Sequence, residues 1–271
     1  MLWEFDATGK FVKEWGPHNY AASFAHSVRV DKHDNVWQID EGSGMVVKYN
    51  PQAVPVEQFG RTPEAIDYLE SAVEKQGRGY ENEVRREERH EEMVKRLHPD
   101  GTVGTFNRPT DVAWDSADNI YISDGYVNSR VARYDKDGNW AGSFGEPGSG
   151  PGQYSTLHSM VIDRQDRLYI ADRNNRRIQV TDTSGKVLKV ITIDVPVPAN
   201  APFAIGNRPA PGQPPIQQQP GSPWAICITQ GPTQVLYVSD AFPGRIYKMS
   251  LHGQLLGMLG GTGKDRKSTR L

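Results

Sequence analysis

Two histidines occupy the same position in a repeated sequence pattern, and imidazole is a side chain that can bind a metal ion or move a proton. The pattern opens with FAHSVRVD (24–31), NRPTDVAWD (107–115), TLHSMVID (156–163) and SPWAICIT (222–229). When these four runs are aligned, one column holds His26, Thr110, His158 and Trp224. A fold that gathers this column into one ring would bring His26 and His158 to a common point, although they are far apart in the chain.

Such a ring predicts a specific kind of metal chemistry. His26 and His158 belong to the first and third units, and alternate units of a six-unit ring are about 120° apart by symmetry. A third imidazole is then expected from a fifth unit, which would begin just after Gly263. Three imidazoles leave one coordination position for substrate or water, as in catalytic zinc sites. The alternative at this point is that both histidines simply form hydrogen bonds within a central channel.

The elements that would position these residues are short strands. Each opening run leads into a second run, namely NVWQID (35–40), NIYISD (119–124), RLYIAD (167–172) and VLYVSD (235–240), and then into a third run and a short fourth run. The runs alternate, are rich in Val, Ile and Tyr, and are separated by turn residues, which is typical of β-strands. Four strands in a unit of about 45 residues match one blade of a β-propeller. We therefore predict an all-β, six-bladed-type propeller.

The repeat also predicts the domain organisation. Residues 1–16 align with the second half of a unit, so about four and a half blades are expected within one propeller domain at 1–263. A charged, helix-forming insertion interrupts the repeat at 61–98, as a surface excursion or a lid, and a Pro/Gln-rich loop interrupts it at 195–221. Residues 264–271 carry no strand pattern and resemble a non-native tail. We expect the chain to be a fragment of a longer propeller.

Composition excludes several classes of protein. The 31 basic and 33 acidic residues give a net charge of −2, so the basic footprint of a nucleic-acid-binding protein is missing. One cysteine excludes a disulfide framework, and no apolar run is long enough to span a bilayer. We expect a monomer. No signal peptide is visible, and a secreted or periplasmic location stays open.

Other recurring residues are expected to be structural. Asp40, Asp124, Asp172 and Asp240 end the second run of every unit, and short carboxylates at such positions accept hydrogen bonds from loop N–H groups. The single cysteine, Cys227, lies in the apolar run WAICIT and is expected in the core.

Three stretches resemble one known family closely. They are FAHSVRVD, RPTDVAWDSADNIYISDGYVNSRVARYDKDGNW and GSGPGQYSTLHSMVIDRQDRLYIADRNNRRIQV. These stretches resemble NHL repeats and, more narrowly, the peptidyl-α-hydroxyglycine α-amidating lyases. The resemblance is most specific over residues 106–182. It implies a six-bladed propeller that holds zinc on three histidines and a structural calcium in its channel. The reaction that it implies splits a peptidyl-α-hydroxyglycine into a peptide amide and glyoxylate.

The resemblance assigns roles to four residues. His26 and His158 match two zinc ligands, and the third histidine would belong to the next unit. Tyr126, in SDGYVNSR, matches the proposed catalytic base, and Arg173, in ADRNNRR, matches an arginine that faces the substrate carboxylate. Val127 stands where the animal enzymes have a disulfide cysteine, which implies a bacterial-type branch.

Two further readings of the sequence stay open beside the zinc lyase. One is a non-catalytic NHL propeller that presents its face to a protein or peptide, and the other is a related propeller enzyme that acts on another small molecule. For Tyr126 the structural alternative is an aromatic residue at the rim of a turn. For Arg173 it is a loop-anchoring role, because Arg176, Arg177 and Arg245 show that these loops favour arginine.

Overall fold

The computed structural model describes residues 2–17, 19, 21–60, 106–197, 220–240 and 242–260. They fall into two compact units, Met1–Pro109 and Thr110–Leu271, and each unit is described by itself. The predicted single domain at 1–263 stays a prediction. The insertion at 61–98, residues 198–219 of the Pro/Gln-rich loop and the tail at 264–271 lie outside the described residues.

The first unit contains a hairpin and one four-stranded antiparallel sheet. The strands are β1 (Leu2–Phe5), β2 (Phe11–Trp15), β3 (Ala25–Val30), β4 (Val36–Asp40), β5 (Met45–Tyr49) and β6 (Pro55–Phe59). The hairpin matches the half unit expected at 1–16. Its Trp15 packs edge-on against Tyr49 of the sheet, with 6.3 Å between ring centroids.

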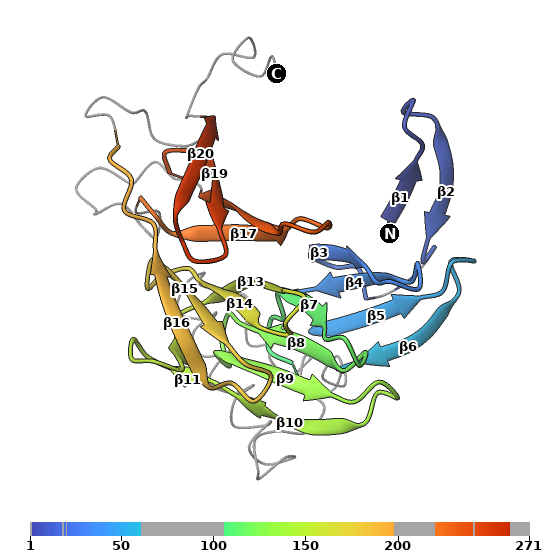
Figure 1. Ribbon diagram of the computed structural model, residues 1–271. Coiled ribbons are helices and arrows are strands. Elements are labelled where there is room, and N and C mark those ends of the chain that lie inside the picture. The colour runs from blue at the N-terminus through green and yellow to red at the C-terminus, as the bar shows by residue number, and fades with distance from the viewer. Residues whose placement is uncertain are drawn as a thin grey trace, which may run out of the picture. The chain divides into compact units, whose positions relative to one another are not determined.

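The second unit contains three further four-stranded antiparallel sheets, each in chain order, and one short parallel pair (Figure 1). The first sheet comprises β7 (Asp111–Trp114), β8 (Ile120–Asp124), β9 (Arg130–Tyr134) and β10 (Trp140–Phe144). The parallel pair is β11 (Glu146–Pro147) and β12 (Gln153–Tyr154). The second sheet comprises β13 (Leu157–Ile162), β14 (Leu168–Asp172), β15 (Arg177–Thr181) and β16 (Val187–Thr192). The third comprises β17 (Pro223–Ile228), β18 (Val235–Asp240), β19 (Arg245–Ser250) and β20 (Leu255–Gly260).

The sheets of the second unit pack face to face through alternating apolar side chains, as in a propeller. One core cluster joins the first two sheets through residues such as Tyr121, Leu157 and Met160. Another joins the second and third sheets through Ile178, Val238 and Tyr247 among others. The first strand of the middle sheet, β13, contacts both β7 and β17, so the first strands of consecutive sheets are neighbours. This confirms the all-β propeller arrangement predicted from the repeat, and the described residues contain no helix.

The recurring aspartates are structural, as predicted. Asp40 accepts the N–H groups of Phe24 and Ser43, at 2.8 and 2.7 Å. Asp172 accepts that of Ser155 at 2.8 Å. All four carboxylates of the column are buried, and burial raises the pKa of Asp240. At Asp124, side chains also donate, from Asn128 at 2.6 Å and Arg130 at 3.0 Å.

The prediction for Cys227 is wrong, because this residue is exposed. Alternation along β17 places Ile226 in the core, where it is 2% exposed, and points the next side chain to the opposite face. No helix among the described residues could cross a membrane.

The column aspartates give a stability prediction. Asp172 is fully buried, pairs with Arg177 at 2.7 Å and also accepts the Ser155 N–H. Asp172→Asn should lower the free energy of unfolding by about 3 kcal/mol, because Arg177 loses its buried partner. The matched control is Asp182→Asn, in a surface turn of the same sheet, which should lower it far less. Urea unfolding measures both, and equal losses would contradict the structural role given to Asp172.

Candidate functional site

The column that holds the two histidines marks a repeated distortion of the first strands. In β13, Leu157 pairs with Asp172 and Ser159 with Ala171, so His158 is an extra residue in a β-bulge. The same interruption of register occurs at His26 in β3 and at Trp224 in β17. Bulges re-aim side chains and are common next to active sites. The sequence column is therefore a structural position that turns its side chain away from the regular pleat.

Both ring nitrogens of His158 have partners. Its Nδ1 lies 2.7 Å from the carbonyl oxygen of Trp224. A carbonyl can only accept, so Nδ1 carries the hydrogen and donates it. In the neutral imidazole Nε2 then has the lone pair, and the Tyr126 hydroxyl, 3.1 Å away, donates to it. Tyr126 and His158 thus come together as the predicted site requires.

Tyr126 is positioned by a very close packing of backbones. It follows Gly125 in the turn after β8, and the N–H of Leu157 donates to the Gly125 carbonyl at 3.2 Å. A Cβ added to Gly125 would come within 1.8 Å of the Leu157 carbonyl oxygen. Only glycine therefore lets this turn approach β13 closely enough for the Tyr126 ring to meet His158 edge-on, with centroids 5.7 Å apart.

Arg173 lies beside this pair in the turn after β14. Its N–H donates to the Thr156 carbonyl at 3.0 Å, and the residue is 4% exposed. The guanidinium carbon lies 4.5 Å from the Trp224 ring centroid and 5.4 Å from that of Tyr126. Arg173 is therefore a buried cation held against two aromatic rings.

The neighbouring arginines have a different role, as predicted. Arg177 donates to the carbonyls of Ser149, Gly150 and Gln153, Arg176 to that of Pro220, and Arg245 to that of Pro196. They anchor loops, whereas Arg173 packs against the rings of the site.

Trp224 is the site residue that sequence reasoning missed. Indole is not a metal ligand, but the backbone carbonyl of Trp224 accepts the hydrogen bond from Nδ1 of His158. Its ring also packs against the His158 ring, with centroids 4.8 Å apart. The signal was its place in the histidine column. The other member of that column, Thr110, is fully buried, and its hydroxyl donates to the Leu157 carbonyl at 2.7 Å.

His26 lies at the bulge of β3 in the first unit and is partly exposed. The two units are described separately, so its pairing with His158 stays a prediction. The residues that the structure describes contain no group of three or more His, Cys, Asp or Glu side chains that could hold a metal ion. His158 nevertheless fits the role of one ligand, because metal-binding histidines usually donate their second ring N–H to a carbonyl or carboxylate.

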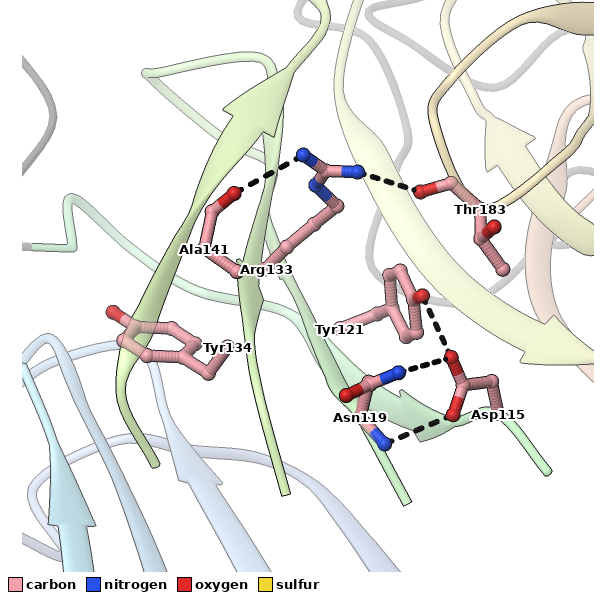
Figure 2. A pocket seen from close by; sticks show the side chains of 7 residues that line it. All are labelled: Asp115, Asn119, Tyr121, Arg133, Tyr134, Ala141 and Thr183. Atoms are coloured by element: carbon pink, nitrogen blue, oxygen red, sulfur yellow. Dashed lines mark hydrogen bonds between the residues drawn. The ribbon is translucent and has the colours of Figure 1, made fainter. Parts of the chain in front are cut away.

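A cavity of about 250 Å³ lies at the opposite end of β8 from Tyr126 (Figure 2). Arg133 crosses it and donates to the carbonyls of Ala141 and Thr183, at 3.1 and 3.0 Å. Burial raises the pKa of Tyr134 to about 12, and burial together with the Asp115 carboxylate raises that of Tyr121. Both phenols are neutral near pH 7, and the bonds of Arg133 join its own sheet to the turn that contains Thr183.

Comparison with known families supports the propeller assignment. Residues 106–204 match the model of the family DUF5128, described as a 6-bladed beta-propeller. Two solved structures cover nearly the whole chain at low identity, which shows the fold alone. Virginiamycin B lyase from Staphylococcus aureus has a TM-score of 0.53 at 13% identity, covering 97% of this chain and 63% of that one. A streptogramin B lyase has a TM-score of 0.55 at 12% identity, covering 97% and 62%.

Curated relatives confirm the resemblance to NHL propellers and amidating enzymes. Rat peptidylglycine alpha-amidating monooxygenase is 38% identical over 100 residues, which are 35% of this chain and 10% of the relative. A probable peptidyl-alpha-hydroxyglycine alpha-amidating lyase of Caenorhabditis elegans is 31% identical over 90 residues, 32% and 26% of the two chains. Human NHL repeat-containing protein 3 is 26% identical over 189 residues, 66% and 44%. This chain thus spans less than half of each of these curated relatives and is a β-propeller with sequence similarity to NHL repeat proteins and amidating enzymes.

The close packing at Gly125 gives a prediction. Gly125→Ala should destabilise the chain by about 2 kcal/mol, because the new methyl group overpacks the contact with Leu157. Gly257→Ala is the matched control, since a Cβ there meets nothing within 4 Å and neither glycine has a positive φ. Urea denaturation of the two variants measures the difference. Equal stability of the two would show that this contact does not hold the Tyr126 turn.

Proposed function

We propose that this chain carries part of the active site of a zinc-dependent lyase that cleaves a peptidyl-α-hydroxyglycine to a peptide amide and glyoxylate. The observation that carries the proposal is the contact between the Tyr126 hydroxyl and Nε2 of His158, beside the buried guanidinium of Arg173. Homology to an amidating lyase supports the same reaction class. A proton-transfer group, a potential metal ligand and a fixed cation are the parts that this reaction needs.

The reaction redistributes a proton and one bonding pair without an oxidant. Tyr126 acts as the phenolate: it takes the proton of the carbinol hydroxyl, the electron pair of that O–H bond forms the carbonyl of glyoxylate, and the carbon–nitrogen bond breaks. The nitrogen leaves with that bonding pair and takes a proton back, which gives the peptide amide. The Arg173 guanidinium binds the carboxylate of the glycine unit in a forked geometry.

Zinc would be held by His26 and His158, and when bound it supplies Lewis-acid chemistry that lowers the pKa of a carbinol oxygen. The Nε2 lone pair of His158 can serve only one partner at a time. If Nε2 bound a metal, it would no longer accept the hydrogen bond from the Tyr126 hydroxyl. Tyr126 would then be available to the substrate. The structural calcium, the bacterial-type branch and the monomeric state remain predictions from the sequence.

Catalytic roles are tested by release of glyoxylate from a peptidyl-α-hydroxyglycine with zinc supplied. Tyr126→Phe should lower kcat about 10²- to 10⁴-fold, since it removes the proton-transfer group. Arg173→Gln should chiefly raise KM, because the carboxylate loses its cation. Arg176→Gln is the control, since Arg176 binds the Pro220 carbonyl instead. Full activity of Tyr126→Phe would refute the assignment.

Metal binding is tested separately by equilibrium dialysis and elemental analysis. Two imidazoles bind zinc more weakly than three, so we expect weak, partly occupied binding. His26→Ala and His158→Ala should each lower zinc affinity at least about ten-fold. His252→Ala should not, because His252 is exposed in a turn. Tight stoichiometric zinc that survives both substitutions would contradict the proposed ligands.

A second candidate is a non-catalytic NHL propeller that binds a protein or peptide. The similarity to human NHL repeat-containing protein 3 favours it, because that match covers 66% of this chain. Peptide binding that is unchanged in His26→Ala and His158→Ala, in a chain that releases no glyoxylate, would support this candidate over the lyase.

A further inference from the structure

The backbone on both sides of His158 is held by two consecutive residues of the preceding sheet. Thr110 donates from its hydroxyl to the Leu157 carbonyl at 2.7 Å. Asp111 accepts the Ser159 hydroxyl at 2.8 Å and the Met160 N–H at 3.0 Å, both at Oδ2. Thr110 and Asp111 are 0% and 1% exposed. The bulge that presents His158 is thus fixed at the residues before and after it.

The Asp111 contact belongs to a network that crosses three first strands. Asp111, Ser159 and Ala225 occupy one column, directly after the column that contains His158. Asp111 accepts the N–H of Met160. In the same way, Ser159 Oγ accepts the N–H of Ile226, at 3.2 Å. The Ser159 hydroxyl therefore donates to Asp111 on one side and accepts from β17 on the other. These hydrogen bonds connect β7 to β13 and β13 to β17. Trp224, whose carbonyl binds His158, lies two residues before Ile226.

A carboxylate suits this position better than a neutral side chain. Oδ2 of Asp111 takes two donors while Oδ1 accepts the N–H of Val112 at 3.0 Å. All three partners donate, and an ionised carboxylate only accepts, so the match is complete for these bonds. Hydrogen bonds to a charged acceptor are also the stronger ones.

We propose that Asp111 is a positioning residue for His158, holding the β13 bulge so that Nδ1 faces the Trp224 carbonyl and Nε2 faces Tyr126. Asp111 acts through the Ser159 hydroxyl and the Met160 N–H. Its importance for turnover depends on the proposed lyase function, whereas its effect on the imidazole does not.

The experiment reads the imidazole directly. In the full chain labelled with ¹⁵N-histidine, NMR shifts of the ring nitrogens report which one carries the hydrogen, and His158→Gln assigns the signal. We expect one tautomer, protonated at Nδ1, in the unsubstituted chain. Asp111→Asn keeps the shape of the side chain but places an N–H₂ group against N–H and O–H groups that also donate. It should give averaged tautomer shifts for His158 and lower any glyoxylate-releasing kcat about ten-fold with little change in KM.

The matched control is Asp115→Asn, at the far end of the same sheet. Asp115 is also buried, accepts the N–H groups of Ala117 and Asn119, and accepts the Tyr121 hydroxyl. The Asp115→Asn variant should have a lower Tm and unchanged ring-nitrogen shifts of His158. If Asp111→Asn lowers the Tm equally and leaves those shifts unchanged, the positioning role is overturned.

Two further outcomes are separable. If Asp111→Asn does not fold, Ser159→Ala removes one donor and leaves the Met160 bond. Altered His158 shifts in it support the proposal, and unchanged shifts overturn it. A chain whose His158 shifts respond to Asp111→Asn, but whose glyoxylate release is unchanged by Tyr126→Phe, refutes the proposed reaction alone.

Discussion

The buried carboxylate that closes each second strand is the constraint on which the site depends. Asp172 accepts the N–H of Ser155 and pairs with Arg177, so one side chain fixes both the approach to β13 and the start of β15. Arg173 directly follows Asp172. The segment that Asp172 fixes at Ser155 leads into β13 and to His158. A structural aspartate therefore sets the relative positions of a cation and an imidazole without entering the chemistry. Because the desolvated carboxylate costs free energy unless its bonds are made, this geometry admits little variation.

The same arrangement in the neighbouring sheet places the phenol. Asp124 ends β8, and Gly125 and Tyr126 follow it, so the chain leaves the strand at a fixed point and turns toward β13. Three sheets thus contribute to the site: the first supplies Tyr126, the second His158 and Arg173, and the third Trp224. The site is built from two positions of the repeat, the bulge of the first strand and the turn after the second strand, with different residues at each use. The repeat fixes the positions of the backbone, and the residues that differ between repeats supply the functional side chains.

Much of this could be predicted from the sequence, because strand alternation and column position are local signals. The strands, the structural aspartates and the loop-anchoring arginines follow from periodicity and residue type alone. The resemblance assigns Tyr126 and His158 to one site, and the structure places them within hydrogen-bonding distance, while their roles stay predictions. Cys227 was placed wrongly, because a short apolar run does not show which face of a sheet is covered. The roles of Trp224 and Asp111 could not be predicted, since one acts through its carbonyl and the other through the backbone of a neighbouring strand.

The single lone pair on Nε2 of His158 connects these features. The Trp224 carbonyl fixes the hydrogen on Nδ1, and this leaves Nε2 as an acceptor directed at Tyr126. Without metal, the phenol is the partner that satisfies Nε2 in a half-buried site. A metal ion bound at Nε2, as proposed, would occupy the same lone pair, and the Tyr126 hydroxyl beside Arg173 would lose this acceptor. Occupation of one nitrogen would then change the hydrogen bonding of a tyrosine that follows a strand of a different sheet. One hydrogen bond, between Tyr126 and His158, would thereby link the proposed ligand site to the proposed base.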